Sequence, residues 1–433
     1  MKKILFVLGS LICSNLIGQE NNDLTGKVDN RYLPDVNALY KGFDALERTK
    51  GYQEFANRLF RENRDLQSSE IYAHAAWMYG KANLPDSSVQ MLHLAIDRGM
   101  ANPNILTKFD LSKNIEALDG GKELRMRLDS IQKKLKEVEN FEMETTAMQR
   151  FWDYFESAKK DMANAKLYFK EFILEGPAEL RDYYAVRYNN TDLMTNQMIK
   201  TSPKYYTYLK QKFNSDSIKS LKAETSRWMK RFKEIYPPAM FPNVYIVPGI
   251  LNSGGTSTEM GLFVGGDMYG KSETAPVGEL SDWQKGALMN FKDLPGLAIH
   301  ELMHFQQNYR DSINSGNVLH KIVEEGVCDF LVELSSGKQM ENGNLDYLEN
   351  PENEKMILKD LRKDMYTKDL SKWMYNGGDI TDRPHDLGYT MGYLIAKSYY
   401  KNQKDKKQAV FELLNTDDMV EIVKKSDYGH VLE

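Results

Sequence analysis

The feature that most constrains this chain is the pattern His-Glu-x-x-His, in which His300, Glu301 and His304 stand within the run Ala-Ile-His-Glu-Leu-Met-His-Phe-Gln. Residues four apart lie one above the other on an α-helix, so both imidazoles can reach one metal ion while Glu301 projects beside them. Two imidazoles, a position for water and a neighbouring carboxylate make up the chemistry of a zinc hydrolase. We therefore expect a Zn²⁺ site with Glu301 as general base.

The sequence around the motif predicts a helix. Asp293 is suited to cap its N-terminus, and Pro295 suits the first turn. Apolar residues then recur as far as Phe305, which would bury part of the helix. Partial burial is what a metal site needs if the surroundings of its ligands are to be controlled.

A catalytic zinc ion takes three protein ligands, so a third ligand should follow the motif. Residues 318–334 have apolar residues at helical spacing and contain Glu324 and Glu325, which flank the apolar stripe on opposite sides. Periodicity leaves the choice between them open. Asp329 lies one turn after Glu325 on the same face, where it can accept a hydrogen bond from a ligating histidine. We assign Glu325 as the ligand, Asp329 as its support and Glu324 as a solvated or structural charge.

The residues His300-Glu-Leu-Met-His304, followed by Glu325-Gly-Val-Cys-Asp329, resemble the gluzincin clan of zinc metallopeptidases, of which thermolysin is a familiar member. More closely, the chain is similar to predicted secreted zinc-dependent peptidases of bacterial envelopes. These share a glycine-rich strand region before the motif and a later Arg-Pro-x-Asp-Leu-Gly-Tyr segment, here residues 383–389. The resemblance covers residues 144–433. It implies a secreted peptidase with a small β-sheet next to the motif helix, and therefore a peptide or protein substrate.

The same resemblance implies a residue that stabilises the developing oxyanion. In gluzincins a tyrosine or histidine from outside the two metal helices has this role. Tyr389 ranks first here, His385 second, and Arg383 is a further candidate. Gly388 and Gly392 are spaced by four and predict a smooth helix face for close packing, without a chemical role.

The remaining sequence predicts a mainly α (α+β) protein. At 433 residues with 41% apolar residues, the chain can build several substantial cores. Helical patterns fill most of the chain up to residue 236, and strands are expected at 243–247 and 261–266. A helix pair over 71–99 resembles a tetratricopeptide repeat. The predicted division is a signal peptide over 1–18, a helical tetratricopeptide-like region over 19–120, and a metallopeptidase-like domain over 121–433, helical over 121–236 and carrying sheet and metal-site helices over 237–433.

The N-terminus predicts export. A charged start is followed by the apolar run Ile4–Ile12, which is too short to span a bilayer, and cleavage is expected near Gly18. The protein would then be periplasmic or extracellular. Cys13 offers a lipidation site, but the bulky Ile12 before it makes a lipoprotein the less favoured interpretation. Membrane association is expected only if Cys13 is lipidated.

Charge and composition limit the other functions. The net charge is -5 and charged residues are dispersed, so no basic stripe predicts a nucleic-acid partner. One alternative to the peptidase is an envelope interaction or assembly protein, in which the N-terminal helices bind a protein partner and the zinc site is structural or vestigial. Another is a zinc amidase that acts on cell-wall fragments.

Overall fold

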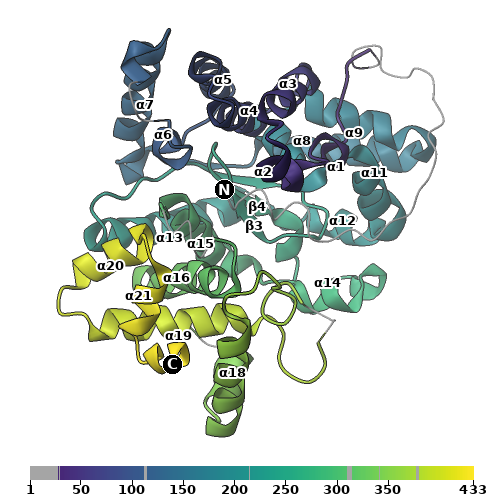
Figure 1. Ribbon diagram of the computed structural model, residues 1–433. Coiled ribbons are helices and arrows are strands. Elements are labelled where there is room, and N and C mark those ends of the chain that lie inside the picture. The colour runs from purple at the N-terminus through teal and green to yellow at the C-terminus, as the bar shows by residue number, and fades with distance from the viewer. Residues whose placement is uncertain are drawn as a thin grey trace. The chain divides into compact units, whose positions relative to one another are not determined.

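The computed structural model describes residue 28 and residues 30–433, except 112–114, 214, 310–314, 341 and 377–379. Helix accounts for 65% and strand for 3%, which confirms a mainly α protein with a small sheet (Figure 1). The predicted signal peptide and Cys13 lie outside the described residues. None of the helices in the described part of the chain combines the length and apolar character needed to cross a membrane.

The chain forms two compact units. One contains the described residues up to 222 together with 240–298, and the other contains 223–239 and the described residues from 299 to 433. Two helices run from one unit into the other, α13 (Ser215–Ile235) and α15 (Leu294–Gln306). The predicted boundary at residue 120 falls inside the first unit, and the predicted division into domains stays a prediction.

The first unit consists mainly of helices. The helix pair predicted over 71–99 corresponds to α4 and α5, and α3 lies beside α4 (Figure 1). The Ser88 hydroxyl donates to the carbonyl of Ala76 at 2.7 Å, because buried alanines let α5 approach α4 closely. The helices of this unit are α1 (Val36–Leu39), α2 (Leu46–Thr49), α3 (Tyr52–Glu62), α4 (Ser69–Lys81), α5 (Pro85–Asp97), α6 (Ile105–Lys108), α7 (Gly121–Leu135), α8 (Thr146–Lys160), α9 (Ala165–Leu174), α10 (Ala178–Tyr183), α11 (Thr191–Met194), α12 (Pro203–Leu209) and α14 (Asp282–Ala287).

Four short strands form one sheet in the first unit, in the order β1-β2-β4-β3. The predicted strands are β2 (Val244–Val247) and β4 (Leu262–Gly265), and they pair in parallel. β1 (Met143–Glu144) extends the sheet in parallel, and β3 (Gly255–Ser257) pairs antiparallel to β4. The sequence did not indicate β1, which is too short to show alternation, or β3, which lies in a glycine-rich stretch.

The sheet lies near the start of α15. A Cβ atom placed on Gly254, next to β3, would come within 3.4 Å of the Leu297 side chain, and both residues belong to the first unit. This contact agrees with the expected placement of a small sheet next to the motif helix.

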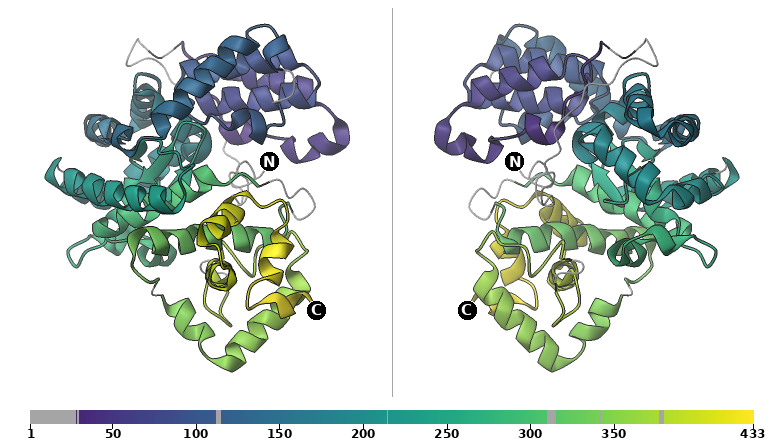
Figure 2. Two further views of the ribbon diagram at one scale, coloured as in Figure 1. Left: turned by 90° about the vertical axis from the view of Figure 1, so that its left-hand side faces the viewer. Right: turned by 90° about the vertical axis from the view of Figure 1, so that its right-hand side faces the viewer.

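The second unit is built around α16 (Val318–Ser336) and α19 (Leu387–Asn402) (Figure 2). A Cβ atom on Gly326 would overlap the backbone of Gly392, so the two helices cross in backbone contact. The glycine face predicted around Gly392 is thereby confirmed. The unit also contains α17 (Gly343–Leu348), α18 (Pro351–Asp364), α20 (Lys406–Asn415) and α21 (Met419–Lys424).

Candidate metal centre

The motif helix α15 is held by apolar burial. Leu294, Ile299 and Leu302 are fully buried, and the helix starts next to Pro295 in its first turn, as the sequence predicts. His300 and His304 lie one turn apart, with ring centroids 4.9 Å from each other.

The second helix of the site, α16, covers the predicted range of 318–334. Asn317 caps its start by accepting a hydrogen bond from the backbone N–H of His320 at 2.8 Å, and Gly337 ends it in the left-handed conformation. Nearly every residue from Val318 to Leu331 is buried. The carboxylates on this helix are therefore enclosed and need partners.

Three atoms from the two helices converge. The Nε2 atoms of His300 and His304 are 3.2 Å apart, and Oε2 of Glu325 lies 3.3 Å from the first and 3.1 Å from the second. All three side chains are largely buried, with 12%, 14% and 6% of their surfaces exposed. A tetrahedral zinc ion with ligand distances of about 2.0–2.1 Å places its ligand atoms roughly 3.3–3.4 Å apart. The three atoms therefore have the spacing of one face of a zinc site.

The outer ring nitrogens fix which tautomers the histidines adopt. Nδ1 of His300 lies 2.8 Å from Oδ1 of Asp329, and Nδ1 of His304 lies 2.9 Å from Oε1 of Gln307. The Gln307 amide is oriented because its Nε2 donates to the carbonyl of Glu324 at 2.7 Å. Since both partners of the histidines are acceptors, each Nδ1 carries a hydrogen. Both Nε2 lone pairs then point at the carboxylate oxygen. Three acceptor atoms this close repel one another unless a cation, either a proton or a metal ion, lies between them.

The pKa shifts agree with this need. Burial by itself lowers the pKa of His300, but the hydrogen bond to Asp329 and the contact with Glu325 outweigh burial and raise it well above its ordinary value. Burial likewise lowers the pKa of His304, but the Glu325 charge outweighs burial and the net shift is upward. Burial would raise the pKa of Glu325, yet the two imidazoles hold it well below its usual range. The carboxylate is therefore negatively charged.

The neighbouring carboxylate, Glu324, has a different partner. Its Oε2 lies 2.6 Å from Nζ of Lys321, and both side chains are buried. Burial raises the pKa of Glu324, but the Lys321 charge outweighs this and lowers it overall. The structure thus brings Glu325 to the two histidines and pairs Glu324 with a lysine.

Cys328 also lies near the histidines. One ring nitrogen from each of His300 and His304 lies within 4.8 Å of its thiol, a grouping that could also hold a metal ion. Of the ring nitrogens, the thiol Sγ contacts Nδ1 of His304, at 3.5 Å. This nitrogen lies on the other side of the ring from Nε2. One ion cannot use both nitrogens of one imidazole, so we take the Nε2, Nε2 and Oε2 set as the candidate ligands.

The other predicted site residues have different surroundings. Glu301 is buried on α15, with 7% of its surface exposed. The Tyr389 hydroxyl hydrogen-bonds to that of Tyr375, and the Tyr375 hydroxyl lies 3.5 Å from Oε1 of Glu325. His385 is exposed, and Arg383 pairs with Asp360 at 2.8 Å.

Tyr375 is a site residue that sequence reasoning missed. It lies in an irregular segment fifty residues after Glu325, and no motif or periodicity marks it. Its backbone φ of 60° is rare for a bulky residue and is visible only in the structure.

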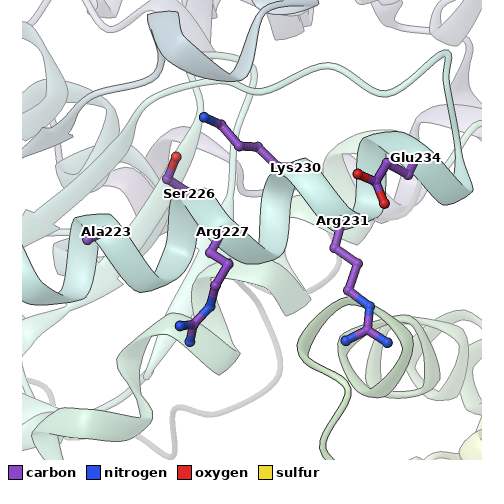
Figure 3. A pocket seen from close by; sticks show the side chains of 6 residues that line it. All are labelled: Ala223, Ser226, Arg227, Lys230, Arg231 and Glu234. Atoms are coloured by element: carbon purple, nitrogen blue, oxygen red, sulfur yellow. The ribbon is translucent and has the colours of Figure 1, made fainter.

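A hollow elsewhere in the second unit lies along one face of α13 (Figure 3). The Arg227 guanidinium there pairs with Glu224 at 3.3 Å, and that of Arg231 lies against Gly337. The described lining residues contain neither histidine nor cysteine and form no cluster of metal ligands. They are Ala223, Ser226, Arg227, Lys230, Arg231 and Glu234.

Comparison with protein families identifies the chain. The family model of the gliding motility protein GldB matches residues 130–430, about seven tenths of the sequence. The chain belongs to the GldB family. No curated protein and no solved structure was found to match it.

Membership of the GldB family corrects the functional expectations. The family is one of gliding motility proteins and not of gluzincin peptidases, so the predicted zinc metallopeptidase is wrong, as are the assignments as hydrolase, protease and metalloprotease. The expected peptide substrate is unsupported. The tetratricopeptide resemblance receives no support from a match that begins at residue 130. The catalytic roles predicted for Glu301, Tyr389 and His385 depended on hydrolysis and lose their basis with it.

The physical reason for the error lies in what the motif specifies. His-Glu-x-x-His with a later Glu-x-x-x-Asp sets a few side chains around a cation, and this geometry serves metal binding whether or not a bound water reacts. The family match draws on about three hundred residues instead.

The label of the family, GldB_lipo, points to lipoproteins of the cell envelope, and this agrees with the predicted export to the envelope. The label gives no support to the expectation that a lipoprotein is the less favoured interpretation.

Proposed function

We propose that this protein is a non-enzymatic component of a gliding machinery in the cell envelope, where it acts by binding protein partners. The observation that supports this function is the match of residues 130–430 to the GldB family. The helices before residue 130 lie outside the match, and we propose them as one surface for a partner. This is the interaction role that the sequence offered as an alternative to hydrolysis.

We further propose that the second unit contains a Zn²⁺ ion held by His300, His304 and Glu325, which stabilises the unit without taking part in a reaction. The support is the convergence of three buried acceptor atoms at 3.1–3.3 Å, each histidine being oriented by an acceptor on its other nitrogen. An ion at this point would join α15 to α16, and its binding free energy would add to the stability of the unit.

Metal analysis tests the site. The wild-type protein should contain about one zinc ion per chain by elemental analysis, and His300→Ala and Glu325→Gln should contain almost none. Glu324→Gln is the matched control, because Glu324 is also buried, at the adjacent position of the same helix, but pairs with Lys321. Zinc lost from Glu324→Gln and kept by Glu325→Gln would reverse the ligand assignment.

Motility tests the function. In the source bacterium, chromosomal His300→Ala should reduce colony spreading, since the unit loses its ion and stability. Glu301→Gln removes a carboxylate from the same helix without removing a ligand. It should keep both zinc and spreading. Loss of spreading in a Glu301→Gln strain that retains zinc and normal protein levels would contradict a non-enzymatic role.

A further inference from the structure

Tyr375 occupies a strained position beside the candidate metal centre. Its φ of 60° lies in the left-handed region, which bulky side chains rarely adopt. About half of the residue is exposed, at 47%, so burial of its ring does not explain the conformation. Strained backbone persists where the surrounding structure fixes it, and such positions cluster at functional sites.

The residues on either side of Tyr375 hold it in place. Trp373 is fully buried and donates from Nε1 to Oδ2 of Asp364 at 3.2 Å. Asn376 and Asp386 form a reciprocal pair, in which each backbone N–H donates to the other side chain, at 3.2 and 2.9 Å. Tyr375 is therefore fixed from both sides.

This anchoring directs the Tyr375 hydroxyl to one particular oxygen. It lies 3.5 Å from Oε1 of Glu325, a long contact, while Oε2 of the same carboxylate faces the two histidines. Tyr389 on α19 hydrogen-bonds to the Tyr375 hydroxyl, with the two rings edge-on and their centroids 6.1 Å apart. The two oxygens of Glu325 therefore have separate partners.

We propose that Tyr375 is a positioning residue of the metal centre, which holds Glu325 as a ligand through Oε2 alone and so slows release of the ion. This inference rests on the zinc site proposed above. A carboxylate oxygen that accepts a hydrogen bond from tyrosine is less free to rotate onto the metal or away from it.

Zinc release provides the test. Full-length protein loaded with one equivalent of ZnCl₂ is mixed with an excess of a chromogenic chelator, and the rate of zinc transfer is followed for wild type and variants. Tyr375→Phe removes only the hydroxyl. Tyr375→Asn keeps a residue that tolerates left-handed backbone but cannot reach Glu325. Tyr366→Phe is the control, since Tyr366 is an exposed tyrosine of the same unit.

Both Tyr375 variants should release zinc about tenfold faster than wild type, with the melting temperature of the metal-free protein unchanged and Tyr366→Phe at the wild-type rate. Zinc release by Tyr375→Phe within twofold of wild type would overturn the inference while leaving the zinc site intact. Loss of metal-free stability in both variants would make Tyr375 a structural residue and also overturn it. If the wild-type protein cannot be loaded with zinc, the proposed zinc site itself is wrong.

Discussion

Two adjacent glutamates on α16 differ in what surrounds them. Glu325 faces two imidazoles and Glu324 faces a lysine, although both are buried on the same helix. The choice between them from sequence depended on Asp329, placed one turn further on. The structure puts that carboxylate 2.8 Å from Nδ1 of His300, where it orients the ring.

Asp329→Asn should weaken zinc binding without abolishing it. The amide can still accept through its oxygen, but it no longer stabilises positive charge on the imidazole, so we expect a loss in affinity of about 10- to 100-fold. Competition against a zinc chelator measures this. Asp346→Asn, an exposed aspartate of the same unit, is the control, and equal affinities for the two variants would rule out the supporting role.

Asp182 in the first unit predicts a pH dependence of stability. It is fully buried and accepts hydrogen bonds from the hydroxyls of Ser68 and Ser69 and, at 3.3 Å, from the backbone N–H of Glu70. Burial, followed by the charge of Glu70, raises the pKa of Asp182 to about 7. The folded state thus binds this proton more tightly than the unfolded chain, in which an aspartate titrates near about 3.9.

The stabilisation by protonated Asp182 is complete below about pH 4 and is lost as the pH rises through about 7, a change of up to about 4 kcal/mol. Asp182→Asn cannot ionise, so its melting temperature relative to wild type should increase between about pH 5 and pH 8. Thermal melts at both pH values measure the difference. The exposed Asp417→Asn serves as control, and a constant offset between Asp182→Asn and wild type would contradict the prediction.

At the scale of elements, the crossing of α16 and α19 shapes the second unit. Gly326 directly follows the candidate ligand Glu325, and a side chain there would overlap the backbone of Gly392. The helix that carries Glu325 is thus packed so closely against α19 that position 326 has no room for a Cβ atom. The sequence indicated a smooth face on α19 but did not show that Gly326 is its partner.

Gly326→Ala should destabilise the protein by about 3 kcal/mol or more, because the overlap is with backbone that cannot move aside. It should also reduce zinc content, since α16 is displaced. Thermal melting and elemental analysis test both effects. Gly343→Ala, at the start of α17 with open space around it, should be neutral or slightly stabilising. Similar melting temperatures for these two variants would refute the close crossing.

At the scale of the whole molecule, both the family match and the N-terminal sequence bear on whether a lipid anchors the protein to a membrane of the envelope. The family label points to lipoproteins, and Cys13 follows an apolar run of the length found in export signals. We propose that Cys13 carries the lipid. Cleavage would then come before Cys13, which would be the first residue of the mature chain, and not after Gly18.

Cys13→Ser should then move the protein from the membrane fraction to the soluble envelope fraction. Fractionation with immunodetection measures this, and mass spectrometry of the wild-type N-terminus should find a lipid-modified Cys13. Cys328→Ser leaves the proposed anchor in place and should stay with the membrane. A wild-type N-terminus at Gln19 would exclude the anchor.

The sequence by itself determined the features that depend on local geometry. The spacing of His300 and His304 places both rings on one face because a helix has about 3.6 residues per turn, and the apolar periodicity located α15 and α16. Strands β2 and β4 were visible in their residue types. Their partner β3 was not, because its pairing depends on β4 and not on its own sequence.

Tertiary structure decided every feature that joins residues far apart in the chain. It brought the Tyr375 hydroxyl to Glu325, paired Glu324 with Lys321 and matched Gly326 with Gly392. Only comparison over residues 130–430 separated a gliding motility family from a peptidase. A short motif fixes the positions of its own side chains through the helix, whereas the contacts around them depend on how distant segments pack, which no local spacing encodes.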